Sequence, residues 1–314
     1  MPEKAFTHLL PGAVPGVWPV MLTPYDAEGD VDLEAIDRDT DALIDWGSAG
    51  LFPVALSGEM YELTVSERVA VATRVVQRAA GRVPVVAAVT ERGTAEQIAA
   101  EARHIADTGV DAVVLIASQL IDDSPSGSDA SADDAELRRI VHVVLDANPG
   151  TSFGIYECPL PYHRLLSTDL VAWLGQTGRF TFFKETSHDI ELMAERVRAT
   201  EGTPLRVLNA GIENLTQSLD VGVAGLSGWI ATVYPDLVAQ LIALHSRGDA
   251  EGARALQAEL ARVEQGMGAT YPSSAKYLVD ARASLDIRHH SRWRPSSIDS
   301  AALDTLVAEL SVAT

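Results

Sequence analysis

Lysine is rare in this chain, and one lysine stands where an amine could become a nucleophile. Only three lysines occur among the 314 residues, and Lys184 follows the apolar run Phe180–Phe183. An amine carried out of a buried strand into a pocket loses hydration, which disfavours its charged form. A neutral amine of this kind can form a Schiff base with a ketone. The alternative is a solvated lysine at a strand end, because a chain with 21 arginines uses lysine sparingly everywhere.

Two further strand ends carry groups that would complement such an amine. Tyr156 ends the run that begins at Phe153, and its phenol could relay protons near the imine carbon. Ser57, together with backbone N–H groups of the turn at Gly58, could hold the carboxylate of a 2-oxo acid. The set therefore indicates Schiff-base chemistry on a 2-oxo acid, provided that the fold brings these strand ends together.

Short apolar runs alternate with longer segments of helical periodicity, which is the pattern of repeated βα units. Eight strands are predicted, at Gly16–Leu22, Gly50–Val54, Val83–Val89, Ala112–Ile116, Ser152–Tyr156, Phe180–Lys184, Leu205–Leu208 and Gly225–Gly228. Between them, helices are predicted at Leu33–Trp46, Val65–Ala80, Ala95–Thr108, Ala135–Ala147, Thr168–Gln176, Ile190–Ala199 and Leu215–Val221. Asp32 and Ser66 could begin helices, and Gly47, Gly109 and Gly222 stand where helices should end.

Eight such units predict an α/β protein with a closed parallel (β/α)8 barrel, in which active sites gather at the carboxyl ends of the strands. The alternative is an open doubly wound sheet, but the chain lacks a Gly-x-Gly-x-x-Gly after the first strand and a Walker-type phosphate loop. We expect an N-terminal extension over 1–15, the barrel over 16–232 and a helical region over 233–314 packed on the barrel. Its helices are predicted at Asp236–Arg247, Ala250–Gly266, Pro272–Arg282 and Ser300–Leu310.

The composition limits the partners of the protein. A net charge of −20 argues against nucleic acid and anionic membranes, because both repel an acidic surface. The single cysteine, Cys158, allows no internal disulfide and has no histidine at a zinc-ligand spacing. No secretory signal is evident in Met1–Trp18, and no apolar run reaches the ~20 residues needed to span a bilayer. The sequence therefore predicts a cytoplasmic protein.

One connection, Ser118–Asp134, is polar and acidic and is predicted to be a mobile loop. Its carboxylates could suggest a calcium site, but the glycine and glutamate spacing of an EF-hand loop is absent, so no metal site is predicted. These carboxylates belong to Asp122, Asp123, Asp129, Asp133 and Asp134.

Several motifs together resemble the dihydrodipicolinate synthase and N-acetylneuraminate lyase family of Schiff-base aldolases. The resemblance extends from about Gly16 to the C-terminus. It is carried, in order along the chain, by Leu22-Thr23-Pro24-Tyr25, Ala55-Leu56-Ser57-Gly58-Glu59, Leu63-Thr64, Glu67-Arg68, Tyr156-Glu157-Cys158-Pro159, Phe183-Lys184-Glu185-Thr186, Asn209-Ala210-Gly211 and Gly222-Val223-Ala224-Gly225.

The resemblance implies a (β/α)8 barrel with C-terminal helices, assembled as a homotetramer of paired dimers. It implies an imine between Lys184 and a 2-oxo acid such as pyruvate, with Tyr156 as the general acid/base and no metal or organic cofactor. The protonated imine would act as an electron sink, so that a C–C bond can break or an enamine can form.

Departures from the family pattern argue against lysine biosynthesis. Leu56 stands where one of two adjacent hydroxyl residues is usual, Ala117–Leu120 lacks the tyrosines of the lysine-pathway enzymes, and Pro161 replaces their arginine. Other positions are nearer to the sugar-acid lyases and are candidate substrate ligands. These positions are Thr186, Gly211, Glu213 with Asn214, and Ser227 with Gly228. For Glu213 and Asn214, a simple role in the first turn of a helix is an equally good interpretation.

The leading hypothesis is a Schiff-base lyase, either an aldolase or a dehydratase, acting on pyruvate or a 2-keto-3-deoxy sugar acid with an aldehyde partner. One alternative is a catalytically weakened relative that binds a 2-oxo acid as a sensor. Another is 4-hydroxy-tetrahydrodipicolinate synthase. A third is an unrelated barrel enzyme in which Lys184 only pairs with a phosphate or a carboxylate.

Overall fold

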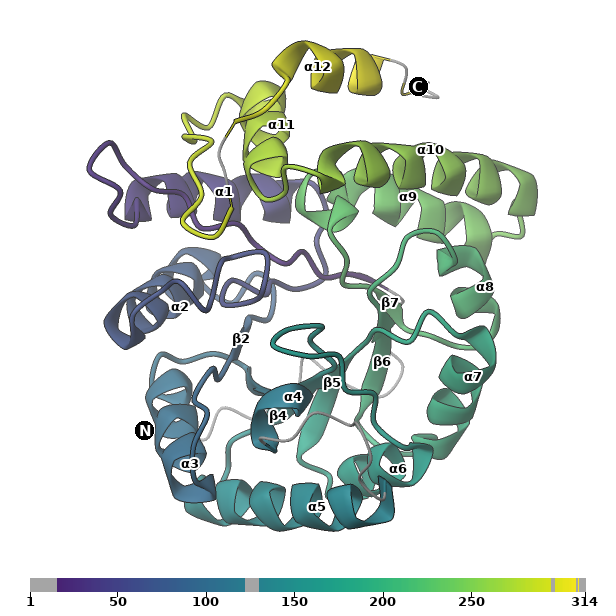
Figure 1. Cartoon of the computed structure of the whole chain (residues 1–314). Helices are drawn as coiled ribbons and strands as arrows, with labels where there is room; N and C mark the ends of the chain where they lie inside the picture. The colour runs from purple at the N-terminus through teal and green to yellow at the C-terminus, as the bar shows by residue number, and fades with distance from the viewer. Residues whose placement is uncertain (1–15, 122–129, 295–296, 309, 311–314) are drawn as a thin grey trace.

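The computed structural model describes residues 16–121, 130–294, 297–308 and 310 (Figure 1). The extension predicted for residues 1–15 lies outside the described residues, and so do Asp122, Asp123 and Asp129 of the acidic connection.

Seven parallel strands form one curled sheet in the order β1-β7-β6-β5-β4-β3-β2. The strands run at β1 Gly16–Val17, β2 Val86–Ala88, β3 Ala112–Ile116, β4 Phe153–Tyr156, β5 Phe180–Glu185, β6 Arg206–Asn209 and β7 Gly225–Leu226. The central strands reach nearly the predicted length, whereas the ladder at β1, β2 and β7 is shorter than the apolar runs suggest.

The predicted second strand, Gly50–Val54, joins the two edges of this sheet through isolated bridges. Leu51 pairs with Val85, and Phe52 pairs with Val20. The Met21 N–H donates to the Phe52 carbonyl at 3.0 Å and the Ala88 N–H donates to the Val54 carbonyl at 3.0 Å. These bonds close the ring, so the predicted (β/α)8 barrel is confirmed.

Proline explains why the ladder is broken there. Pro19, Pro53 and Pro84 lie in the three runs that meet at this seam, and proline has no N–H to donate. The runs are extended and adjacent, but regular pairing is interrupted.

The helices follow the predicted order with ends that differ by a few residues. They run at α1 Leu33–Asp45, α2 Val65–Ala79, α3 Ala95–Ala106, α4 Ala117–Leu120, α5 Ala130–Ala147, α6 Thr168–Gln176, α7 Ile190–Ala199, α8 Leu215–Asp220, η1 Ile230–Thr232, α9 Pro235–Ser246, α10 Ala250–Gly268, α11 Ser273–Ala283 and α12 Ser300–Ala308. No helix among the described residues is both long enough and apolar enough to cross a membrane.

Helix caps show one confirmed and one wrong prediction. The Asp32 side chain accepts from the N–H groups of Glu34 and Ala35, as a cap should. The cap of α2 is Thr64, and Ser66 lies inside the first turn. Thr64 and Glu67 satisfy each other's backbone N–H groups in a capping box, which outcompetes a serine placed two residues too late.

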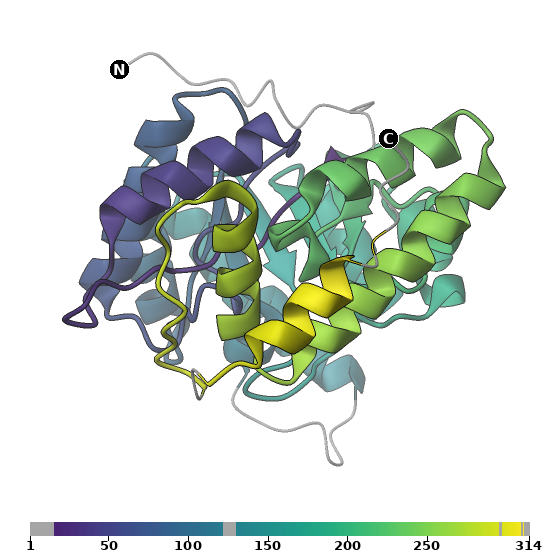
Figure 2. The same ribbon diagram turned by 90° about the horizontal axis from the view of Figure 1, so that it is seen from above.

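The helices surround the strands, and α10, α11 and α12 lie outside this ring on the side of α1 and α9 (Figures 1 and 2). Helix α9 packs against β1, and α10 packs on α9. The C-terminal helices share an apolar core with Val17 and Leu226 of the barrel.

Aromatic rings fill the barrel below the end of β5. Phe182 packs against Trp18 and Phe52, with ring centroids 5.3 and 5.6 Å apart. Gly154 on the neighbouring strand gives Phe182 its room, since a Cβ at Gly154 would lie 3.1 Å from the Phe182 Cβ. Side chains two residues apart share a face of a strand, so Lys184 stands directly above Phe182.

A buried ion pair connects the C-terminal region to the loop after the second strand segment. The Lys276 ammonium donates to Glu59 Oε1 at 2.7 Å, and neither side chain is exposed. The Glu59 carboxylate also accepts from the Ser291 hydroxyl and from the Arg292 and Trp293 N–H groups. Glu59 thus anchors the segment around residue 292 to the loop after the second strand segment.

We expect Glu59→Gln to lower the free energy of unfolding by about 3–5 kcal/mol, because it leaves the buried Lys276 ammonium without a counter-charge. Urea denaturation followed by circular dichroism measures this loss. Glu62→Gln is the matched control, since Glu62 is exposed in the same segment. An equal effect of the two substitutions would contradict a stabilising role for the buried pair.

Candidate active site

Lys184 and Tyr156 lie side by side at the carboxyl ends of β5 and β4. They are register partners in the sheet, and the Lys184 Nζ is 4.8 Å from the centroid of the Tyr156 ring. Both side chains line a cavity of about 430 Å³, which is large enough for a small metabolite. Lys184 is only 3% exposed, and it is one of the residues that line this cavity.

Burial lowers the pKa of Lys184 to about 7, and the Cys158 thiol and the Glu264 carboxyl oppose this shift. No ion pair joins the amine to a carboxylate in the described part of the chain. A large fraction of the amine is therefore neutral at physiological pH and can act as a nucleophile.

The Tyr156 phenol keeps its proton. Burial raises its pKa well above the ordinary value, and the nearby Cys158 thiol and Tyr61 phenol add to this effect. Tyr61 donates to the Leu160 carbonyl at 2.9 Å and lies 3.8 Å from the Cys158 sulfur. Burial also raises the pKa of Cys158, so this residue is a protonated neighbour of Tyr156.

The cavity gathers five of the ten residues that the sequence predicted for the site, and Asn214 and Gly228 are not among its lining. The predicted residues among its lining are Tyr156, Lys184, Thr186, Gly211 and Glu213. Ser57, Gly58 and Ser227 are buried nearby but are not among the lining residues.

The Gly58 backbone is held too tightly for a side chain. A Cβ would lie 2.4 Å from the Pro53 carbonyl oxygen, and the Gly58 carbonyl accepts from the Thr23 hydroxyl at 2.7 Å. The Ser57 and Thr232 hydroxyls oppose the rise that burial causes in the pKa of Tyr271, which places them near that phenol. The Ser227 hydroxyl is buried without a hydrogen-bond partner among the described residues.

Glu213 is paired with a histidine at the mouth of the cavity. His188 Nδ1 lies 2.7 Å from Glu213 Oε1, and both side chains are about half exposed. This bond raises the pKa of His188 and lowers that of Glu213. Gly211 makes the pairing possible, because a Cβ there would lie 2.6 Å from both paired atoms.

Thr186 presents its hydroxyl to the cavity from a fixed position. The hydroxyl donates to the Glu157 carbonyl at 2.7 Å and lies 2.8 Å from His163 Nε2. Burial lowers the pKa of His163, so this ring is mainly neutral at pH 7.

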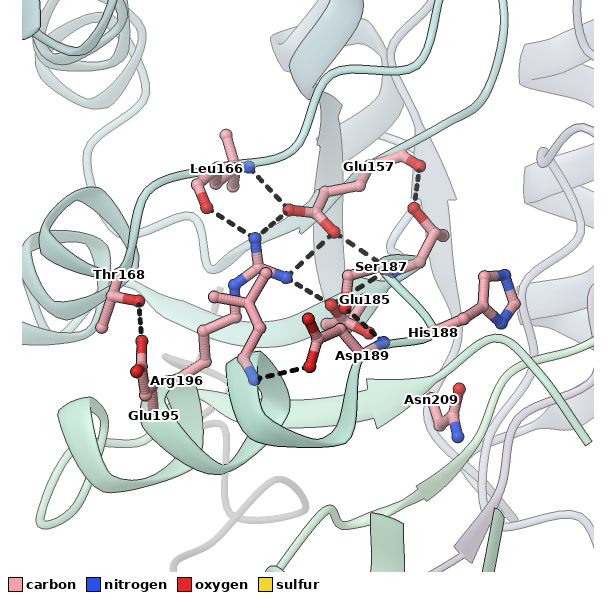
Figure 3. Close-up of polar contacts among 12 residues, drawn as sticks. Glu157, Leu166, Thr168, Glu185, Ser187, His188, Asp189, Glu195, Arg196 and Asn209 are labelled. Atoms are coloured by element: carbon pink, nitrogen blue, oxygen red, sulfur yellow. Dashed lines mark hydrogen bonds and ion pairs between the residues drawn. The ribbon is translucent and has the colours of Figure 1, made fainter. Parts of the chain in front are cut away.

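Behind the cavity, Arg196 of α7 joins the carboxylates that follow Tyr156 and Lys184 in sequence (Figure 3). Glu157 and Glu185 both pair with its guanidinium, and all three side chains are fully buried. Arg196 also donates to the Leu166 carbonyl at 2.5 Å. Glu157 accepts from the Leu166 and Thr186 N–H groups at 2.7 and 3.1 Å. The network therefore holds the strand ends that carry Tyr156, Lys184 and Thr186.

The acidic connection forms protein contacts where it is described. Asp133 pairs with Arg164 at 2.7 Å, and Asp134 accepts from Ser167. No cluster of three or more histidine, cysteine, aspartate or glutamate residues suited to a metal occurs among the described residues.

Among the lining residues that were not predicted from the sequence are His163, Trp229 and Glu264. For Glu264 a signal existed, because it is a carboxylate on the apolar face of a helix, at helical spacing from the buried Leu260 and Met267. The other two follow turns, where periodicity gives no orientation.

Comparison with known proteins agrees with this geometry. The sequence model of the dihydrodipicolinate synthetase family matches residues 13–295. The chain belongs to this family. An uncharacterized DapA-like lyase of Halobacterium salinarum is 30% identical over 87% of this chain and 84% of its own length. A 4-hydroxy-tetrahydrodipicolinate synthase of Methanoculleus marisnigri is 26% identical over 80% of this chain and 83% of its own.

Solved structures share the fold. Dihydrodipicolinate synthase DapA-2 of Bacillus anthracis matches with a TM-score of 0.83 at 20% identity, covering 94% of this chain and 98% of its own. A prophage protein of the same family from E. coli K12, solved in complex with pyruvate, matches with a TM-score of 0.80 at 21% identity over 95% and 97% of the two chains. The protein is accordingly an enzyme of the dihydrodipicolinate synthetase family, a lyase of the class I aldolase type.

We expect the Lys184 amine to titrate with a midpoint near pH 7, well below the ~10.4 of an ordinary lysine. Reductive methylation with formaldehyde and cyanoborohydride, read by peptide mass spectrometry, should rise as the pH passes through about 7. Lys276, buried in its ion pair, serves as an internal control and should stay unmodified. A midpoint near 10 for Lys184 would show that the amine is an ordinary charged lysine.

Substitutions in the Arg196 network should lower the free energy of unfolding by unequal amounts. Arg196→Met leaves two buried carboxylates facing each other and should cost about 3–5 kcal/mol of unfolding free energy. Glu157→Gln leaves the neutral pair of Arg196 with Glu185, so the protein should stay folded.

The pH dependence of Glu157→Gln is the sharper test of this network. Burial raises the pKa of Glu157 from 4.5 to about 7, and Arg196 opposes the rise. The folded state therefore binds more protons than the unfolded state between these values, and Glu157 lowers stability as the pH rises through this window. The unfolding free energy of Glu157→Gln, minus that of the unsubstituted protein, should therefore increase by on the order of 3 kcal/mol from pH 4 to pH 8. Urea denaturation at the two pH values measures this change. Glu195→Gln on the exposed face of α7 is the control, and a pH-independent difference for Glu157→Gln would contradict the assignment.

Proposed function

We propose that the protein is a Schiff-base-forming lyase that acts on a 2-oxo acid, with Lys184 as the imine-forming nucleophile and Tyr156 as the general acid/base. The observation that carries the proposal is the buried Lys184 amine, with a pKa near 7, held 4.8 Å from the Tyr156 ring in a cavity. A neutral amine attacks a ketone, and a protonated phenol beside it can donate the proton that the carbinolamine oxygen needs in order to leave as water.

The remaining predicted ligands have supporting roles in this proposal. Thr186 and the backbone at Gly211 would contact substrate oxygens, and Glu213 would contact hydroxyl groups further from the imine. Ser57, Gly58 and Ser227 would line the carboxylate end once substrate is bound, since they are buried beside the cavity. The 2-oxo acid is pyruvate or a 2-keto-3-deoxy sugar acid. The E. coli relative that was solved with pyruvate supports the former.

A second candidate activity is that of 4-hydroxy-tetrahydrodipicolinate synthase, because the Methanoculleus relative carries that name. Two observations count against it in this chain. Leu56 lines the cavity where a hydroxyl residue is usual, and Pro161 stands in place of an arginine, while Arg164 is engaged with Asp133. Condensation of pyruvate with aspartate semialdehyde would favour the second candidate.

We also propose that the enzyme works in the cytoplasm as a homotetramer, a dimer of dimers. The family resemblance supports the assembly, and the single buried cysteine is compatible with a reducing compartment. The division into a barrel over 16–232 and a helical region over 233–314 belongs to the same proposal.

Borohydride reduction in the presence of pyruvate should add the mass of the reduced pyruvate adduct to the peptide that contains Lys184. The imine needs a primary amine at this position, so Lys184→Arg should give no adduct and should lose at least about a thousandfold in activity. Intact-protein and peptide mass spectrometry measure both outcomes.

Lys276→Arg is the matched control, because it changes a buried lysine outside the cavity and should leave labelling of Lys184 intact. Absence of an adduct with pyruvate and with a panel of other 2-oxo acids would refute the imine mechanism. Appreciable activity of Lys184→Arg would do so as well.

A further inference from the structure

Helix α10 contributes a carboxyl group to the Lys184 cavity from outside the barrel. Leu260, Val263 and Met267 of this helix are buried in the C-terminal core, and Glu264 lies on the neighbouring part of the same face. Its side chain lines the cavity together with Trp229. The helix therefore places a carboxyl opposite the strand ends that carry Lys184 and Tyr156.

The position of this carboxyl is fixed by the backbone. Glu264 Oε2 accepts from the Ile230 N–H at 2.7 Å, at the start of η1. Burial raises the pKa of Glu264 to about 7. The bond from Ile230 and the charge of Lys184 oppose this shift, and Glu213 reinforces it. Near neutral pH the group can accept a hydrogen bond as a carboxylate or donate one as an acid.

The cavity continues past Glu264 toward the surface. A second hollow of about 490 Å³ runs along α10 and shares Glu213, Trp229 and Glu264 with the Lys184 cavity. Because the two hollows share these three residues, a longer substrate bound at Lys184 can extend past Glu213 and Glu264 into the second hollow.

The charges that line the Lys184 cavity disfavour an anion. His188 is engaged with Glu213 at 2.7 Å, and no arginine is among the residues that line this cavity. Arg262 lines only the second hollow, where its guanidinium donates to the Leu306 carbonyl at 3.2 Å. A second carboxylate inside the Lys184 cavity would therefore face Glu264 without an arginine beside it. A hydroxyl group has no such conflict, because it can donate to a carboxylate at little desolvation cost.

We propose that Glu264 is a specificity-determining residue that hydrogen-bonds a hydroxyl group on the distal part of the substrate and rejects a second carboxylate there. This inference rests on the proposed imine chemistry at Lys184. It assigns to a C-terminal helix a direct role in the choice of substrate.

Two five-carbon probes test the inference at pH 8, where Glu264 is ionised. One is 4,5-dihydroxy-2-oxopentanoate, and the other is 4-hydroxy-2-oxoglutarate, which carries a carboxylate in place of the terminal hydroxymethyl group. The measured quantity is the ratio of kcat/KM for the dihydroxy acid to that for the dicarboxylate. Glu264→Gln should lower this ratio by roughly 10-fold or more, because it removes the repelling charge but keeps an acceptor for Ile230.

Glu259→Gln makes the same substitution on α10 outside the cavity and should leave the ratio unchanged. Borohydride labelling of Lys184 with pyruvate should be retained in Glu264→Gln, and in Glu259→Gln it should equal that of the unsubstituted protein, which also verifies that both variants fold. An unchanged ratio in Glu264→Gln with intact labelling would overturn this inference alone. Failure of the unsubstituted protein to be labelled would overturn the proposed function and this inference with it.

Discussion

The alternation of side chains along β4 and β5 governs how charge is distributed at the active site. Tyr156 and Lys184 point into the barrel, while the next residues, Glu157 and Glu185, point outward to Arg196 (Figure 3). The inward amine is thereby separated from the carboxylates beside it in sequence. If Lys184 shared a face with either one, an ion pair would hold it charged. The strand period of two thus produces both a neutral amine inside and a paired charge network outside.

The C-terminal helices are part of this site as well as a cover for the barrel. Lys276 of α11 binds Glu59 and so holds the loop that follows the second strand segment. Tyr271, just before α11, stacks on Trp229 with ring centroids 4.4 Å apart. Trp229 in turn lines the cavity beside Glu264 of α10. Loss of packing in this region would therefore disturb the substrate cavity through the Lys276–Glu59 pair, the Tyr271–Trp229 stack and the position of Glu264.

The fold was predictable from the sequence because its main signals are local. Short apolar runs, helical periodicity and glycine helix ends located nearly all elements, and the ends of α6 and α7 were predicted to the residue. The seam at Gly50–Val54 differs because prolines remove ladder donors, which periodicity does not register. The neighbours in the site were harder to predict. His163 and Trp229 follow turns, where periodicity does not predict the direction of a side chain. Glu264 lies about 80 residues after Lys184, and only the tertiary packing of α10 brings it to the same cavity.

The departures from the family pattern change the polarity and charge of the cavity lining. Leu56 replaces a hydroxyl group by an apolar side chain on one wall, and the nearby hydrogen-bonding groups come from Tyr61, Cys158 and Tyr271 around the Tyr156 phenol. Elsewhere in the lining, Gly211 lets His188 approach Glu213 to 2.7 Å, and this bond raises the pKa of the histidine and lowers that of the carboxyl. The remaining charge is the Glu264 carboxyl, since Lys184 is largely neutral before it reacts. Once an imine forms, its positive charge and Glu264 are the two charges that a bound substrate chain must lie between, and an uncharged polar chain fits that field better than an anionic one.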